Sequence, residues 1–320
     1  MNLTLRGRPR VGREHVLLWM RDYGVYVGVA LVVLFNVAFT PHFLTFENFR
    51  TQAVQVAPVL IVALGMALVI ATGGIDLSVG SVMALSAAMI SLYLGYGPLV
   101  AVLVAVGVGA LAGAANGVLV AFAGVQAIIV TLAMMIGGRG LALVLLPQLD
   151  GVRNPDLREL GSGSFLAVPY VVWIAALLVA VVAFLVRRSV FGRRLVAVGG
   201  NRRAAELSGL PVRRVLLGVY ALSGALAAVA GVLVTARLQA ADPNSVGVLI
   251  ELSAITAVVV GGTPLTGGRV RIAGTVAGAV LMQLLVATLI KHDLPPSWTQ
   301  MAQTAVIIGA VYLARDRGRT

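Results

Sequence analysis

The amino-acid sequence predicts an all-α membrane protein with about ten transmembrane helices, a broken or re-entrant segment near residues 72–80, and both termini in the cytoplasm. Hydrophobic residues make up 59% of the 320 residues and charged residues only 11%, whereas about a quarter of a soluble globular domain is charged. The apolar residues fall into runs close to the roughly 20 residues that cross a bilayer as a helix. Most of the arginines form clusters between those runs.

The expected spans follow from the apolar runs taken in order. They cover residues 23–40, 53–71, 78–94, 98–122, 126–146, 168–186, 213–236, 249–262, 272–290 and 297–314. The run 249–262 is short and the run 78–94 is rich in small residues, so these two depart most from a standard span.

Arginine placement predicts the orientation and the division of the chain. The cytoplasmic side of a membrane protein carries the excess of Arg and Lys in its short loops. An N-terminal arm over 1–22, a loop segment over 187–214 and a tail over 315–320 are all rich in arginine. Only an even number of spans places all three in the cytoplasm, so we expect a single transmembrane domain over 23–314 that contains the 187–214 segment.

Several classes of protein are excluded or disfavoured by what the sequence lacks. The net charge of +12 comes almost wholly from arginines at span ends, which is an orientation signal rather than a nucleic-acid surface. There is no cysteine, no HExxH pair and no GxSxG, and Lys291 is the only lysine, so there is no GxxxxGK[ST] loop. We therefore expect no metal site, no catalytic residue and no ATP site in this chain.

The stretch from Thr72 to Gly80 interrupts two apolar runs with glycines and one carboxylate, Asp76. Glycine weakens a helix, so a broken helix or re-entrant turn is expected here. Asp76 or Ser78 could cap the helix that follows, which is the interpretation we favour, or Asp76 could contact a substrate directly.

A few other polar residues lie within the apolar runs. Glu251 either faces water at an interface or belongs to a buried pair. Asn116, Gln126 and Gln283 favour hydrogen bonds between helices over ligand contacts. Because few ionisable residues lie within the spans, a carboxylate proton relay is disfavoured. The GxxxG patterns at 109–117 and 274–278 predict close helix packing.

A short helix is predicted in the loop after the sixth span. Asn201 suits an N-cap, Gly209 the position after the helix, and Pro211 a stop. Its residues could form a surface loop ordered only by its caps, or a peg that docks onto a cytoplasmic partner. In the second case Ala205 and Leu207 are expected on the docking surface.

Four stretches together resemble the ribose-type sugar permeases, the membrane subunits of bacterial ABC importers. These are Ala71–Ser81 (ATGGIDLSVGS), Phe191–Gly209 with its FGRR, VGGN and AA elements, Val258–Gly268 with VVVGGT and GG, and Phe43–Phe49 with FLT and NF. The resemblance runs from about Phe43 to Tyr312. Ser253 and Pro264 depart from it, where an acidic residue and a serine are commoner.

The resemblance implies a division of labour and a set of site residues. A separate ABC ATPase would bind ATP and Mg, a second permease copy or paralogue would complete the path, and an extracytoplasmic sugar-binding protein would deliver the solute. The chain would then lie among lipid in the bacterial inner membrane and carry no cofactor itself. The resemblance implies three groups of site residues: Asn201, Arg202, Arg203, Ala204, Ala205, Glu206, Leu207, Ser208 and Gly209 for coupling to the ATPase; Gly73, Gly74, Asp76, Ser78 and Gly80 for the broken helix; and Gly261, Gly262, Thr263, Gly267 and Gly268 for a glycine-rich turn.

Two alternatives from other classes remain open. A secondary carrier or channel would transport without an ATPase, and an intramembrane enzyme would turn over a lipid or peptide. The first lacks a charge relay within its spans, and the second lacks a catalytic constellation.

Overall fold

The computed structural model describes residues 11–315 and shows a bundle of α-helices. The first ten residues of the predicted arm 1–22 and residues 316–320 of the predicted tail lie outside the described residues. The helices are α1 Val11–Phe39, α2 Phe46–Ala71, α3 Val79–Tyr93, α4 Pro98–Ala121, α5 Ala127–Leu145, α6 Pro155–Ser162, α7 Tyr170–Arg188, α8 Val190–Gly200, α9 Arg202–Leu207, α10 Val212–Leu238, α11 Ile250–Val260, α12 Ile272–Lys291 and α13 Pro296–Arg315, with a 3-10 turn, η1, over Leu94–Tyr96.

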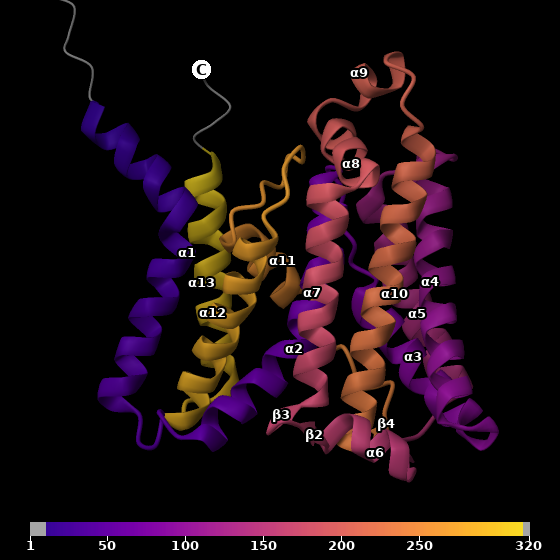
Figure 1. Cartoon of the computed structure of the whole chain (residues 1–320). Helices are drawn as coiled ribbons and strands as arrows, with labels where there is room; N and C mark the ends of the chain where they lie inside the picture. Colours follow the sequence, from indigo (N-terminus) through magenta and orange to yellow (C-terminus); the bar gives the residue numbers. More distant parts are fainter. Residues whose placement is uncertain (1–10, 316–320) are drawn as a thin grey trace, which may run out of the picture.

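The strands are two residues long and form two small antiparallel pairs. They are β1 Asp150–Gly151, β2 Ser164–Phe165, β3 Val168–Pro169 and β4 Ala240–Ala241. β1 pairs with β4, and β2 pairs with β3. Together with α6 they lie at one end of the bundle, whereas α8 and α9 lie at the other (Figure 1).

The predicted class, a helical membrane protein, is confirmed, and each of the ten predicted spans contains a helix. Among the described residues, seven helices are long and apolar enough to cross a membrane. α11 has 11 residues and rises about 16 Å, roughly half of a 30 Å hydrocarbon core. The full count of ten crossings therefore stays a prediction.

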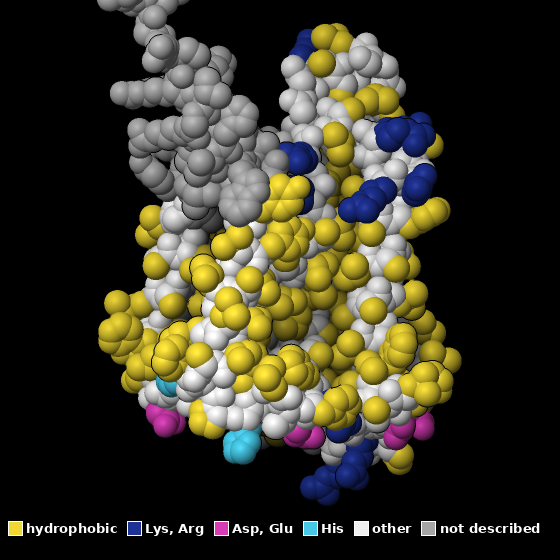
Figure 2. Space-filling model, turned by 60° about the vertical axis from the view of Figure 1, so that its left-hand side comes forward, with side chains coloured by type: hydrophobic (Ala, Val, Ile, Leu, Met, Phe, Trp, Pro, Cys, Tyr) yellow, Lys and Arg dark blue, Asp and Glu magenta, His cyan; other side chains and the backbone are white. Residues whose placement is uncertain are grey.

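The two ends of the bundle differ in charge. Figure 2 shows Lys and Arg side chains near its upper end, a broad hydrophobic band below them, and acidic side chains at its lower end beside a second basic group. α1 begins and α13 ends on the side of α8 and α9 (Figure 1). Positive-inside asymmetry makes that side the predicted cytoplasmic one.

Glycines set the closest helix contacts, as the GxxxG patterns predicted. A Cβ at Gly113 in α4 would lie 2.1 Å from the carbonyl oxygen of Tyr220 in α10, so the two backbones are in contact. A Cβ at Gly278 in α12 would lie 2.0 Å from the carbonyl oxygen of Ala257 in α11. Any larger side chain at these positions would push the paired helices apart.

α2 lies at the centre of the bundle and has two unlike halves. Its inner half is almost wholly buried inside the protein. This helix is also among the most apolar of the spans, with a mean hydropathy of 2.5. Its outer half, FENFRTQAVQ, is polar. Pro58 separates them, and because proline has no amide hydrogen the helical bond to the Val54 carbonyl is missing there.

Candidate functional site

The chain between α2 and α3 is not helical, and Asp76 organises it. Gly73 has φ +81°, a backbone conformation that favours glycine, and regular helix resumes at Val79. Asp76 is 1% exposed. One carboxylate oxygen accepts from the Ser78 amide at 3.0 Å and the Ser78 hydroxyl at 2.6 Å; the other accepts from the Ser223 hydroxyl of α10 at 2.8 Å. Ser78 is the N-cap residue of α3 and makes no side-chain capping bond, so Asp76 stabilises the turn that precedes the helix. Its hydrogen bonds are needed because a buried polar group is stable only when it is bonded.

Neighbouring helices hold this broken segment from three sides. Asn116 of α4 donates to the Ser78 hydroxyl at 2.9 Å, the helix-to-helix bond expected of it. Thr131 of α5 donates to the Ile75 carbonyl at 3.1 Å, which satisfies an orphan carbonyl of the broken segment. A Cβ at Gly74 would lie 2.5 Å from the Tyr220 hydroxyl of α10, so only glycine fits there. Within 72–78 the side chains of Asp76 and Ser78 are buried, whereas Gly73 is exposed. The polar groups of this non-helical segment are thus bonded to neighbouring helices, as such backbone at membrane depth requires.

A second non-helical segment, residues 242–249, meets the start of α3. A Cβ at Gly80 would lie 2.3 Å from the Gly247 carbonyl oxygen and 2.8 Å from a carboxylate oxygen of Glu251. The first turns of α3 and α11 thus approach each other, and Figure 1 shows both helices covering only part of the height of the bundle. Glu251 is half-buried at this meeting point, between the two placements that its sequence left open.

Arg139 holds this second segment against α3, and it was not among the polar residues singled out from the sequence. Its guanidinium donates to the carbonyl oxygens of Pro243 at 2.5 Å, Val246 at 3.2 Å and Gly80 at 3.3 Å. An arginine in the middle of the apolar run 126–146 was the available signal, since a charge at membrane depth is costly unless it has partners.

Three of the four stretches that carry the family resemblance meet at one place, a junction of backbones formed by residues 71–73, 199–200 and 267–268. A Cβ at Gly199 in α8 would lie 1.7 Å from the Ala71 carbonyl oxygen at the end of α2. The Gly268 amide donates to that same oxygen at 2.9 Å. A Cβ at Gly267 would lie 2.8 Å from the Gly199 carbonyl oxygen and 2.9 Å from the Gly73 nitrogen. Nothing larger than glycine fits at positions 199 and 267, so α8 touches the last residue of α2, directly before the broken segment.

The rest of the glycine-rich turn links α11 to α12. A Cβ at Gly261 would lie 2.4 Å from the Gly274 carbonyl carbon, and Gly262 has φ +85°. The Thr263 hydroxyl accepts from the Arg271 amide at 3.1 Å, next to the start of α12. These residues therefore shape a tight connection whose last glycines reach the junction.

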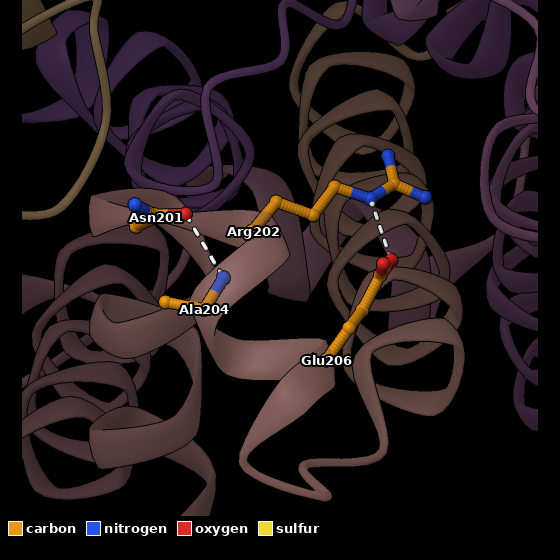
Figure 3. A network of polar contacts seen from close by, with 4 residues as sticks. All are labelled: Asn201, Arg202, Ala204 and Glu206. Atoms are coloured by element: carbon orange, nitrogen blue, oxygen red, sulfur yellow. Dashed lines mark hydrogen bonds and ion pairs between the residues drawn. The ribbon is translucent and has the colours of Figure 1, made fainter.

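The predicted short helix is present as α9 and stands at the end of the bundle (Figure 1). The Asn201 side chain accepts from the Ala204 amide at 3.0 Å, and Arg202 pairs with Glu206 at 3.4 Å (Figure 3). Exposed pairs of this kind contribute about 0–1 kcal/mol. Gly209 has φ +75°, as its position after the helix requires.

One expectation about the surface of α9 is wrong. Ala205 is only 5% exposed and packs against its own chain, because the helix turns that face toward the bundle. Leu207 is 75% exposed. A docking surface on α9 can therefore include Leu207 but not Ala205.

Of the two other polar residues predicted to bond between helices, one does so and one does not. Gln283 of α12 donates to the Gln55 side chain of α2 at 2.6 Å, the interhelical bond predicted for it. Gln126 is exposed at the start of α5, and its side chain makes no capping bond. It is therefore not the interhelical contact that the sequence favoured.

An apolar helical bundle with two non-helical segments held between its helices defines a class, a multi-pass integral membrane protein with the broken helices found in transporters. The comparisons with known proteins agree. The profile of the family described as branched-chain amino acid transport system / permease component matches residues 48–311. The chain belongs to this family of transport permease subunits.

Curated relatives match over most of their own length. The ribose import permease protein RbsC of Escherichia coli is 40% identical over 96% of this chain and 97% of its own. The galactofuranose transporter permease protein YtfT of Escherichia coli is 37% identical over 93% of this chain and 91% of its own. The fructose import permease protein FruF of Bifidobacterium longum is 41% identical over 81% of this chain and 74% of its own. No solved structure matches the chain.

Proposed function

We propose that this chain is the inner-membrane subunit of a bacterial ATP-driven importer and forms the path for a monosaccharide or sugar-like solute. The observation that carries the proposal is the set of near full-length relatives, whose names specify ribose, galactofuranose and fructose transport. An extracytoplasmic binding protein delivers the solute, a separate ABC ATPase binds ATP and Mg, and a second permease copy or paralogue completes the membrane unit.

The coupling role assigned to residues 201–209 is part of this proposal. α9 stands clear of the bundle with Leu207 exposed, which suits contact with a cytoplasmic ATPase. α8 directly precedes α9 in the chain, and its Gly199 contacts the Ala71 carbonyl oxygen. A displacement of α8 and α9 by the ATPase would therefore reach the broken segment through backbone contacts, as a rigid-body movement.

The proposal needs a topology with three cytoplasmic segments. The arm 1–22 and the tail 315–320 flank the 23–314 transmembrane domain, and the segment 187–214 lies within it. Arginine clustering supports it. The start of α1, the short helix α9 and the end of α13 lie toward the same end of the bundle, which is compatible with this topology (Figure 1).

Reconstitution tests the function. The chain is placed in proteoliposomes with the ATPase and binding protein encoded beside it, and uptake of radiolabelled ribose, arabinose, fructose and galactose is measured with and without ATP and Mg. We expect uptake of at least one sugar that requires ATP, the ATPase and the binding protein. Equal uptake by the chain alone would overturn the proposal in favour of a carrier or channel.

A further inference from the structure

A cavity opens between the outer half of α2 and the outer half of α12. Its volume is about 350 Å³, and the polar groups of its lining include Glu47, Asn48, Thr51, Gln52, Gln55 and Lys291. Small-molecule sites typically measure about 300–1,000 Å³, so the space suits a small solute. The cavity lies at the end of the bundle opposite α8 and α9, near the start of α2 (Figure 1).

The lining groups have the chemistry that recognises a polyol. Amide and hydroxyl side chains both donate and accept hydrogen bonds, as each sugar hydroxyl does. Among the described residues, the buried side-chain oxygen of Gln52 has no hydrogen-bond partner. A buried acceptor left without a partner costs about 1–3 kcal/mol, so a rotation of the Gln52 side chain that turns this oxygen toward a ligand hydroxyl in the cavity would be stabilising.

Two hydrogen bonds bridge α2 and α12 at different depths. The Lys291 ammonium donates to the Asn48 side chain at 2.8 Å, and Gln283 donates to Gln55 at 2.6 Å. Asn48 and Gln55 are seven residues apart on one helix, which places the second bridge about 10 Å deeper. Gln55 lines the cavity, whereas Gln283 lies two turns below Lys291 on α12. The outer bridge thus marks the mouth and the inner bridge the floor.

A second cavity adjoins the first across α2. It measures about 290 Å³ and shares Glu47, Thr51 and Gln55 with it, so these residues at i, i+4 and i+8 form one continuous polar strip. The strip ends at the inner bridge, immediately outside Pro58. Polar side chains are thus continuous from the outer surface to the point where the buried half of α2 begins.

We infer that this cavity receives the monosaccharide on the outer side, that the side chains of Gln52 and Gln55 bind its hydroxyls, and that the Gln55–Gln283 bridge is the floor that must part for inward passage. The inference rests on the proposed function and names a site for its substrate. The cavity lining carries one acidic side chain, Glu47, and one basic side chain, Lys291, and its other polar groups are neutral amides and hydroxyls or His42. With no excess of either sign of charge, the lining suits an uncharged polyol better than an ion.

Cysteine labelling tests the site, and the absence of native cysteine makes the unmodified chain the blank. Gln52→Cys and Gln55→Cys are made separately in the reconstituted importer, with Leu166→Cys as an outer-surface control away from the cavity. A membrane-impermeant methanethiosulfonate is added from outside, with and without the sugar that the unmodified importer takes up, and sorbitol serves as the osmotic control. We expect labelling of all three cysteines, slowed at least threefold by the transported sugar at positions 52 and 55 only.

A transport measurement guards against misfolding of either cysteine variant. Gln52→Leu removes an acceptor that has no partner inside the protein, and should raise the KM for sugar uptake at least fivefold. Gln126→Leu makes the same change at an exposed site outside the cavity and should leave KM unaltered. Labelling rates at 52 and 55 that the sugar does not change, or a normal KM for Gln52→Leu, would overturn the site. Failure of the unmodified importer to take up any monosaccharide would instead overturn the proposed function, and appears before any variant is made.

Discussion

Replacing Gly199 by alanine should separate ATP hydrolysis from transport. The new Cβ would lie 1.7 Å from the Ala71 carbonyl oxygen, and real Cβ atoms stay at least 3.0 Å from such atoms. The end of α8 must therefore move away from α2 by about 1.3 Å, the difference between these two distances. The same Cβ would lie 2.7 Å from the Gly268 amide nitrogen, which donates to that oxygen, so it also crowds this hydrogen bond.

The expected cost comes from two sources. Overpacking a close contact costs about 1–3 kcal/mol, and losing a buried hydrogen bond costs about 1–3 kcal/mol. We expect a lower thermal midpoint in detergent and at least a tenfold loss of uptake, while the ATPase still co-purifies because α9 is unchanged.

The neighbouring glycine is a matched control. A Cβ at Gly200 meets nothing within 4 Å, so Gly200→Ala adds the same methyl group at the same helix end without a clash. It should retain normal uptake and stability. If Gly199→Ala also matches the unmodified importer in uptake and thermal midpoint, the idea that α8 acts through the junction is refuted.

The other predictions concern the cap, the docking surface, the topology and the arginine clamp. Asp76→Asn should keep an acceptor for Ser78 and remain more stable in thermal unfolding than Asp76→Ala, which leaves buried donors unpaired at about 1–3 kcal/mol each. Equal and complete loss of uptake in these two variants, both normally inserted, would favour an ionised role for the Asp76 carboxyl group. Leu207→Asp should lower ATPase recovery in co-purification at least tenfold, because burying an unpaired carboxylate at the docking surface costs several kcal/mol. Leu166→Asp, equally exposed at the opposite end of the bundle, should not lower it. Normal ATPase recovery with both variants speaks against docking through α9. In intact cells an impermeant thiol reagent should label Leu166→Cys and not Leu207→Cys, and the reverse pattern would invert the topology. Arg139→Met leaves three carbonyls without their donor and should lower stability by about 2–4 kcal/mol, with Arg139→Lys milder; an unchanged denaturation midpoint for Arg139→Met would show that the clamp is dispensable.

The helices could be predicted because apolar run length reports the bilayer directly. The break at Thr72–Gly80 was visible for the same reason, since glycines and a carboxylate interrupt an apolar run. The caps of α9 were readable because Asn201, Gly209 and Pro211 act locally, through bonds within a few residues.

What the sequence did not reveal depends on contacts between distant residues. Two of the three carbonyl partners of Arg139 lie more than 100 residues away and the third 59 residues away, and carbonyls leave no mark in a sequence. The meeting of Gly199 with Ala71 has the same character. The burial of Ala205 follows from the direction in which the short helix leaves α8, which local caps do not determine. α8 itself was not predicted, because FGRRLVAVGG reads equally well as a basic loop.

The enclosure of Asp76 has a consequence for how the protein is made. Ser223, which completes its hydrogen bonds, is synthesised 147 residues later. At a translation rate of about 5–20 residues per second, the carboxylate waits roughly 7–30 s for that partner. During this interval α2, the most centrally buried helix of the finished protein, has lipid or the insertion machinery where α10 will be. A nascent chain that stops before α10 therefore carries an incompletely hydrogen-bonded carboxyl group at membrane depth, which is costly until Ser223 is in place.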